Sequence, residues 1–332
     1  MKLLFKLSLA AIGVATVSLI FLSTRYQLAR RTDLKNNESS FNEGINRNSQ
    51  YYSTTGVQKE DLVLSERGLY EYNNKPFIWI YWEGHHRPAY VDLCLETLSC
   101  HNFRDFNVKV LNDTEFIKSV KTVHKAYQFL RIHHRSDYFR AKILHTFGGV
   151  YLDIDTIGMK SYKELAAKLP DADVVGASSR GNVDNLHVGD LGPMKAGTKL
   201  TTEWMARIDL ILDLQLKNLR LYSEGKLKEY PVQWSEIVNG AKPILERLVT
   251  QKKIKYSMVD GPSTWTQYDA NQMMGSDENI TSKLKDTEIL SLNNALYPQN
   301  FKEMGRDEIL KSNIGISQLI KYSLEKCKRG FS

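Results

Sequence analysis

Gly148-Gly149-Val150-Tyr151-Leu152-Asp153-Ile154-Asp155-Thr156 is the stretch of sequence that decides the fold. The glycine pair ends a helix, and the residues after it, 150–155, predict a β-strand. Side chains alternate along a strand, so one face of this strand is wholly apolar and the other carries an aromatic ring beside two carboxylates. The apolar side chains are Val150, Leu152 and Ile154, and those on the other face are Tyr151, Asp153 and Asp155.

The two carboxylates at the end of this strand predict a metal site. Like charges placed together repel each other unless water or a cation neutralises them. A hard divalent ion whose remaining ligands are phosphate oxygens would satisfy both Asp153 and Asp155. The structural alternative is a solvated acidic turn after an edge strand, which predicts no ligand.

The segments on either side of this stretch predict an α/β domain. Strands are expected at 77–82, 107–111 and 173–177, and helices from Pro88 to Leu98, at 138–147 with Ser136 as the cap, and at 203–222. The order strand, helix, strand predicts a right-handed crossover and a mainly parallel sheet. The first strand and its helix are not joined by G-x-G-x-x-G, which argues against a dinucleotide-binding oxidoreductase.

The N-terminal part of the chain predicts a membrane anchor and a stem. Leu7 to Thr24 carries no charge, and as a helix it would be about 27 Å long, close to the hydrocarbon thickness of a thin bilayer. A cleaved signal peptide would have a shorter apolar run and a small-x-small cleavage site. We therefore expect a cytosolic tail and transmembrane helix at 1–24, a polar stem or linker at 25–74, and the catalytic domain at 75–332.

Composition adds weaker constraints. The net charge of +7 and pI near 9.0 are compatible with a phosphate-bearing ligand, but the basic residues are scattered and nucleic acid is not expected. Three cysteines without paired C-x-x-C spacing do not make a zinc site. Cys94 and Cys100 are expected to point apart on one helix, which leaves a disulfide involving Cys327 open.

Upstream of the acids, Asp137 and Arg140 stand three residues apart, on one face of a helix near its start. An ion pair between them would be a sufficient structural reason for both, since an acid also suits the helix dipole there. In the functional interpretation Asp137 accepts hydrogen bonds from sugar or ribose hydroxyls and Arg140 holds a donor oxygen.

Taken together, H-R-S-D-Y-F-R-A-K-I-L-H-T-F-G-G-V-Y-L-D-I-D-T, residues 134–156, resembles the DXD sugar-binding region of a glycosyltransferase superfamily. This superfamily includes Golgi initiating mannosyltransferases, capsular polysaccharide synthesis proteins and glucosylating bacterial toxins. Its pattern is S-D-x-x-R, a helix, then G-G-x-Y-x-D-x-D. F-I-W-I-Y-W-E-G at 77–84 and D-G-P-S-T-W-T at 260–266 look like the family's opening strand and its later G-P-x-x-x-T segment.

The resemblance implies a GT-A fold that binds a UDP- or GDP-sugar over the carboxyl ends of the strands. It implies a retaining transfer of a hexose to a glycan, glycolipid or polysaccharide acceptor, with Mn²⁺ or Mg²⁺ bridging the diphosphate to Asp155 and Asp153. Trp79 would stack on the base. The ribose or transferred sugar would be contacted by Asp137, Arg140, Tyr151 and Asp153.

The resemblance also sets an expected topology. It implies a single-pass type II membrane protein of the Golgi or another endomembrane, with a luminal catalytic domain. Sequons at Asn37, Asn112 and Asn279 would permit glycosylation there.

The chain departs from the family pattern near its end. After Tyr297-Pro298 the expected closing segment lacks both an aromatic residue and a histidine, so the third metal ligand and the lid are unassigned. His187 could serve the metal or the acceptor, or lie in a solvated loop, and Trp265 could be an acceptor platform or a core residue. The histidine pairs at 85–86 and 133–134 are expected at the surface.

Two other functions remain as alternatives. A haloacid-dehalogenase-like phosphatase also has D-x-D at a strand end, but here the threonine falls one place early and the upstream motifs stay unexplained. A non-catalytic membrane-anchored sugar-binding protein would keep the same residues. Hydrolysis of a nucleotide-sugar with added manganese would separate it from an enzyme.

Overall fold

The computed structural model contains a compact unit, Gln50–Ser332. It describes residues 51–84, 86–178, 190–260, 270–276, 279–285, 287, 289–292 and 297–329. The expected transmembrane segment at 1–24 lies outside these ranges. Among the helices that the structure describes, none has the length and apolar character needed to span a bilayer.

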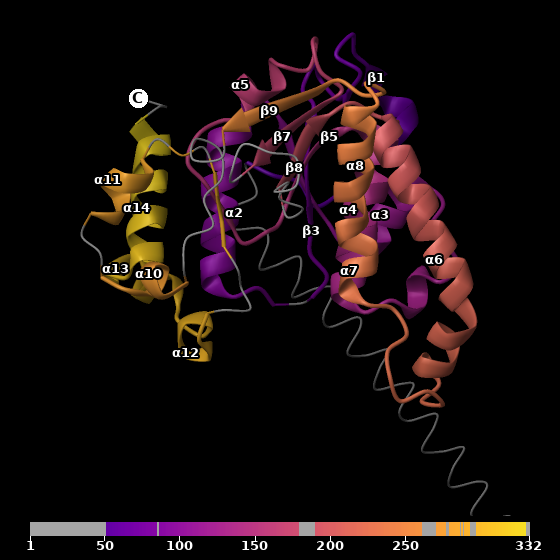
Figure 1. Ribbon diagram of the computed structural model, residues 1–332. Coiled ribbons are helices and arrows are strands. Elements are labelled where there is room, and N and C mark those ends of the chain that lie inside the picture. The colour runs from indigo at the N-terminus through magenta and orange to yellow at the C-terminus, as the bar shows by residue number, and fades with distance from the viewer. Residues whose placement is uncertain are drawn as a thin grey trace, which may run out of the picture. The chain divides into compact units, whose positions relative to one another are not determined.

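A mixed six-stranded sheet forms the centre of this unit, in the order β4-β3-β5-β8-β7-β9 (Figure 1). The β4–β3, β3–β5 and β7–β9 pairs are parallel, whereas β8 runs antiparallel to both of its neighbours. Five of the six strands therefore run in the same direction, and the predicted mainly parallel α/β sheet is confirmed. The strands are β3 (Phe77–Tyr81), β4 (Asn107–Leu111), β5 (Gly149–Leu152), β7 (Val174–Ser178), β8 (Asp190–Met194) and β9 (Tyr256–Asp260).

Helices cover both faces of the sheet, as Figure 1 shows. All five residues of β3 are buried, because its side chains alternate between two cores. Ile78 and Ile80 pack with α2 (Ala89–Asn102) on one face. Phe77, Trp79 and Tyr81 pack on the other face with residues of several helices. The four longest of these helices are α3 (Asp113–Val120), α4 (Ile132–Phe147), α6 (Lys199–Ser223) and α8 (Ala241–Thr250).

The remaining elements are short or lie at the margins of the sheet. They are η1 (Lys59–Asp61), β1 (Val63–Leu64), β2 (Tyr70–Glu71), η2 (Tyr127–Phe129), β6 (Thr156–Gly158), α5 (Lys163–Ala166), α7 (Trp234–Ile237), η4 (Val238–Gly240), α10 (Ala270–Met274), α11 (Ile280–Leu284), β10 (Ile289–Ser291), α12 (Gln299–Lys302), α13 (Arg306–Lys311) and α14 (Gly315–Arg329).

The expected boundary of the stem is wrong at its C-terminal end, because residues 51–74 belong to the compact unit. Ser53 pairs with Lys109 of β4: its N–H donates to the Val108 carbonyl at 3.0 Å and its carbonyl accepts from the Val110 N–H at 2.9 Å. The segment thus adds backbone hydrogen bonds to the edge of the sheet. The prediction missed this pairing because the segment is polar and shows no regular apolar pattern.

Helix α4 begins earlier than predicted. Its N-cap is Arg131, five residues before the expected cap, Ser136, which lies inside the helix. The predicted end is confirmed, since Gly148 caps the helix with φ 69°. Gly149 has φ 99°, and a Cβ there would lie 2.5 Å from the carbonyl oxygen of Phe77. The glycine pair therefore allows β5 to approach β3 closely.

The C-terminal helices pack beside α2 and are joined to it covalently. A disulfide links Cys100 of α2 to Cys327 of α14, with Cα atoms 6.2 Å apart. Cys94, also on α2, is a buried free thiol. The two cysteines of α2 indeed point apart, and Cys327 pairs with the second of them.

Candidate functional site

The two acids of the D-x-D lie where the chain leaves the sheet. Strand β5 ends at Leu152, Ile154 and Asp155 form a turn, and β6 begins at Thr156. The prediction of a strand through 155 is therefore wrong, although Leu152 and Ile154 still pack into the apolar core. The backbone hydrogen bond that Asp155 accepts from the Leu292 N–H, at 3.1 Å, holds this turn against the end of β10.

Arg140 joins the first of these acids to helix α4. Its Nη2 lies 3.1 Å from Asp137 Oδ1 and 3.3 Å from Asp153 Oδ1. The guanidinium also stacks over the ring of Tyr151, 4.6 Å from its centroid. Arg140 is thus surrounded by three other residues predicted for donor binding, Asp137, Tyr151 and Asp153. A guanidinium held between two carboxylates and a ring face has a fixed orientation.

Tyr151 supports Asp153 from within the core. Its ring is buried, and its hydroxyl donates to Asp153 Oδ1 at 2.6 Å. Since that proton is used, the Ser136 hydroxyl, 3.0 Å away, donates to the tyrosine oxygen. The predicted contact of Tyr151 with ribose or sugar is not available to a ring with this burial, so its effect on a ligand passes through Asp153.

Asp137 is the most deeply buried acid of the site, with 1% of the residue exposed. Its Oδ1 contacts Arg140, whereas its Oδ2 has no hydrogen-bond partner among the described residues. Burial raises the pKa of Asp137 to about 7, the charge of Arg140 opposes that rise and the charge of Asp153 adds to it. A buried carboxylate oxygen without a partner is costly, which suits a group that accepts hydrogen bonds from a ligand.

The residues at the D-x-D turn fit a divalent cation whose remaining ligands are phosphate oxygens and water. Both acids are partly exposed, the Asp153 side chain by 33%, and carboxylate oxygens are the ligands that Mn²⁺ and Mg²⁺ prefer. Within the described ranges, no three His, Cys, Asp or Glu residues gather closely enough to hold a metal. Two carboxylates with substrate phosphates and water are a normal set for Mg²⁺.

The position of Trp79 contradicts its predicted role as the base platform. The residue has no exposed surface. Its indole N–H donates to the Gly148 carbonyl at 2.8 Å, and its ring stacks on Phe77 with centroids 4.4 Å apart. Trp79 is therefore a core residue, because a strand interior covered by α4 cannot offer a ring to a ligand.

Trp82 is the tryptophan at the edge of the sheet, and sequence reasoning missed it. It directly follows the last residue of β3 and is only partly buried. Its indole Nε1 is buried without a hydrogen-bond partner among the described residues. Position along the strand was the available signal, since ligands bind beyond the carboxyl ends of strands in open α/β sheets.

Other predicted residues take no part in the described site. His187 and residues 261–266, which include Trp265, lie outside the described residues. His133 is exposed as expected, whereas His134 is buried, and burial lowers the pKa of His134 to about 4. His134 is therefore a buried, neutral residue in the first turn of α4.

Comparison with protein families identifies the region that contains this site. Residues 69–175 match the family model described as the glycosyltransferase sugar-binding region containing DXD motif. The match includes β3, α4 and the turn of Asp153 and Asp155. It confirms the resemblance inferred from residues 134–156 and the enzyme class, glycosyltransferase. None of the curated proteins compared with this chain matches it.

Solved structures with some similarity to the chain carry the following descriptions. The PaToxG glycosyltransferase is 12% identical with a TM-score of 0.33, over 68% of this chain and 80% of that chain. A glycosyltransferase involved in the glycosylation of the major capsid of PBCV-1 is 10% identical, with a TM-score of 0.34 over 68% and 97%. The galactosyltransferase LgtC, in complex with donor and acceptor sugar analogs, is 12% identical, with a TM-score of 0.37 over 75% and 95%. Likeness this distant does not bear on the substrate of this chain.

Proposed function

We propose that this chain, a glycosyltransferase by its DXD-containing sugar-binding region, transfers a hexose from a UDP- or GDP-sugar to a glycan, glycolipid or polysaccharide acceptor. The observation that carries the proposal is Arg140, held between Asp137 and Asp153 at the point where β5 ends. Burying an arginine with two acids costs desolvation free energy. Binding of a polar ligand by the same groups would offset this desolvation cost.

The site residues divide into those that touch the donor and those that position them. Asp137 would accept hydrogen bonds from hydroxyl groups of the donor through Oδ2, its unpartnered oxygen. Arg140 would orient that acid and hold a donor oxygen. Tyr151 would keep Asp153 in place through its hydroxyl. Trp82, at the exit of β3, replaces Trp79 as the proposed platform for the base.

Asp153 and Asp155 would hold the divalent cation, Mn²⁺ or Mg²⁺. Such an ion, bound to the donor's diphosphate, would stabilise the negative charge that develops on the departing nucleoside diphosphate. The protein's own contribution is to fix both carboxylates at one turn. The Tyr151 hydroxyl and Arg140 fix the first acid, and the pairing of β6 with β10 fixes the backbone of the second.

The finer parts of the proposal come from the family resemblance. They are a GT-A architecture, retention of the anomeric configuration, a membrane anchor at 1–24, and a type II topology with the catalytic domain in the Golgi or another endomembrane lumen. The disulfide between Cys100 and Cys327 agrees with that location, because disulfides persist in oxidising compartments.

Ligand-induced stabilisation tests the proposal directly. A ligand that binds only the folded protein raises its melting temperature by mass action. The protein would be screened by thermal shift against UDP- and GDP-hexoses, each with and without MnCl₂. We expect one donor to stabilise the protein in a manganese-dependent manner and to be hydrolysed slowly. Failure of every donor to stabilise or to react with the folded protein would contradict the proposal.

Release of inorganic phosphate from phosphomonoesters is the matched counter-test. The phosphatase alternative predicts this release with an Asp153-dependent rate, and the glycosyltransferase proposal predicts none.

A further inference from the structure

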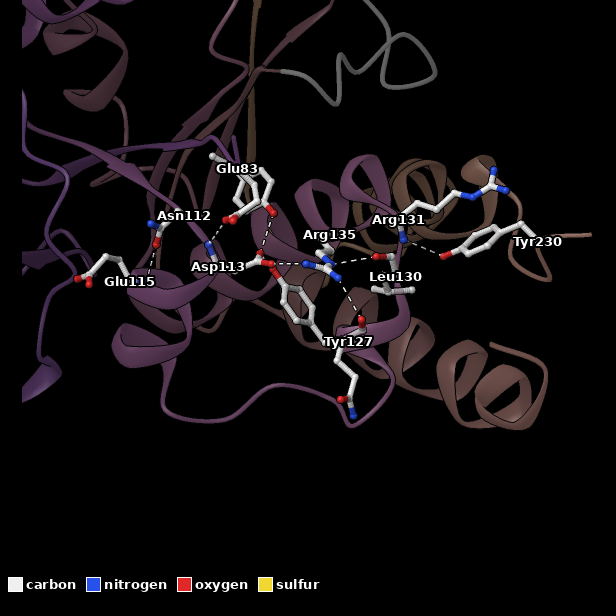
Figure 2. A network of polar contacts seen from close by, with 11 residues as sticks. Glu83, Asn112, Asp113, Glu115, Tyr127, Leu130, Arg131, Arg135 and Tyr230 are labelled. Atoms are coloured by element: carbon white, nitrogen blue, oxygen red, sulfur yellow. Dashed lines mark hydrogen bonds and ion pairs between the residues drawn. The ribbon is translucent and has the colours of Figure 1, made fainter. Parts of the chain in front are cut away.

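Asp113 lies at the centre of a polar network at the carboxyl edge of the sheet (Figure 2). Its Oδ1 accepts hydrogen bonds from the hydroxyls of Tyr81, at 2.7 Å, and Tyr127, at 2.5 Å. Its Oδ2 accepts from Arg135 Nη1 at 2.5 Å. Its backbone N–H donates to Glu83 Oε2 at 2.7 Å. The residue therefore joins the end of β3, the start of α3, the η2 turn and helix α4.

Arg135 extends the network to the loop before α4. Its Nε donates to the Leu130 carbonyl at 2.9 Å and its Nη2 to the Gln128 carbonyl at 3.0 Å. Because these donors point in fixed directions from a planar group, the guanidinium sets the position of the loop relative to Asp113. Figure 2 shows the loop and α4 meeting at this arginine.

Helix capping alone does not account for Asp113. The N-cap of α3 is Asn112, whose side chain accepts from the Glu115 N–H at 2.9 Å. An acid in the first turn would favour the helix dipole by about 0.3–1 kcal/mol without any side-chain partner. The partners of Asp113 instead come from three other elements, all at the carboxyl edge.

The two ends of the network lie beside the proposed donor-binding residues. At one end, Tyr81 and Glu83 flank Trp82 in sequence. At the other, Arg135 directly precedes Ser136 and Asp137. The first turns of α4 are thus fixed twice, to Asp113 through Arg135 and to Asp153 through the contacts of Arg140 and of Ser136 with Tyr151.

We propose that Asp113 is a positioning residue for the nucleotide part of the donor. It sets the separation between the β3 exit, with its Trp82 ring, and the start of α4, with the Asp137 carboxylate. The inference rests on the proposed function, because it assumes that a nucleotide-sugar binds at this edge. Asp113 does not touch the reacting atoms, so its loss acts on nucleotide affinity and leaves the chemical step unchanged.

The test replaces Asp113 by asparagine in the full-length chain. The amide keeps an oxygen for the tyrosine hydroxyls but cannot accept from Arg135 through its nitrogen. With UDP and GDP as probes in the presence of MnCl₂, we expect Asp113→Asn to raise the dissociation constant of the bound nucleotide about tenfold, equivalent to about 1.4 kcal/mol. The kcat of donor hydrolysis at saturation should stay within about twofold.

Glu115→Gln is the matched control on the same helix. The Glu115 backbone joins Asn112 in Figure 2, but its side chain pairs with Lys118 and the Gly56 N–H, so Glu115→Gln should change stability without changing nucleotide affinity. Tyr127→Phe is a milder second variant, which removes one hydroxyl and should raise the dissociation constant about two- to threefold.

The outcomes separate this inference from the proposed function. If the wild-type chain binds neither UDP nor GDP, the proposed function fails and the inference fails with it. If the wild-type chain binds one of them and Asp113→Asn and Tyr127→Phe bind it equally well, only the inference is overturned. An equal fall in kcat and affinity would overturn it too, since that result marks a general structural role.

Discussion

Separate alanine substitutions at Trp79 and Trp82 distinguish the core of the sheet from the donor site. Trp79 has no exposed surface, and large-to-small substitution of a buried tryptophan costs about 3–5 kcal/mol. Loss of its hydrogen bond to the Gly148 carbonyl adds about 1 kcal/mol. We therefore expect Trp79→Ala to lower the free energy of unfolding by about 4–6 kcal/mol.

Trp82→Ala should show the opposite pattern. Trp82 is only partly buried, so its loss should cost only about 1–2 kcal/mol of stability. If the ring stacks on the base, removing it should weaken donor binding by about 1–3 kcal/mol, as for bases stacked on aromatic side chains elsewhere. That range corresponds to a dissociation constant raised about 5- to 150-fold.

Two measurements on the same proteins decide between these assignments. Urea denaturation gives the free energy of unfolding, and titration with the donor and MnCl₂ gives its dissociation constant. Trp79→Phe is the control for Trp79, because it keeps a ring in the core and lacks the N–H donor. A Trp79→Ala protein of normal stability but weakened donor affinity would show that Trp79 binds the donor after all. A Trp82→Ala protein that binds the donor normally would exclude Trp82 as the base platform.

Three further experiments test other parts of the structure. Because burial raises the pKa of Asp137 from 3.8 to about 7, the folded state retains a proton that the unfolded state has lost, and the free energy of unfolding should fall as pH rises from about 4 to about 7. Asp137→Asn should flatten this dependence when urea denaturation is measured at a series of pH values, and an unchanged slope would contradict the raised pKa of Asp137. Reduction of the Cys100–Cys327 disulfide, which spans 227 residues, should lower the free energy of unfolding by up to about 5 kcal/mol on the chain-entropy model, and equal denaturation midpoints with and without reductant would contradict it. Gly148→Ala, at φ 69° with a Cβ 2.7 Å from backbone atoms, should lower the free energy of unfolding by about 2 kcal/mol or more. Gly197→Ala, at φ 62° with open space around the added Cβ, should lower it by only about 1–2 kcal/mol, and equal losses in thermal melts would refute the steric argument.

Hydrophobic patterns predicted the interior of the fold well. The strand expected at 107–111 and the helix expected at 203–222 are both present. They were predictable because the side chains that an element buries recur along the sequence with the period of that element. The strand at β5 was predicted too long because Asp153 and Asp155 continue the alternation of polar and apolar residues after the backbone has left the sheet. Alternation alone does not reveal where hydrogen bonding to neighbouring strands ends.

The site was predicted in part for the same reason. Helix spacing predicted that Asp137 and Arg140 lie together, and the family resemblance added Asp153; the ion pairs of Arg140 with both acids agree with this grouping. Trp79 was wrong, since which of two tryptophans is covered depends on how far α4 extends along β3. Asp113 was missed altogether, because its partners come from segments that are distant in sequence and carry no shared motif.

Manganese-dependent turnover of the donor by the Asp155→Ala protein tests whether the D-x-D turn binds the metal and the donor. We expect this activity to be abolished, because removing one of two carboxylates leaves the cation under-coordinated. The melting temperature of the metal-free protein should not fall, and the exposed Asp171 offers a matched control in which Asp171→Ala leaves both quantities unchanged. Full manganese-dependent activity in Asp155→Ala would contradict the assignment of this turn as the metal and donor site.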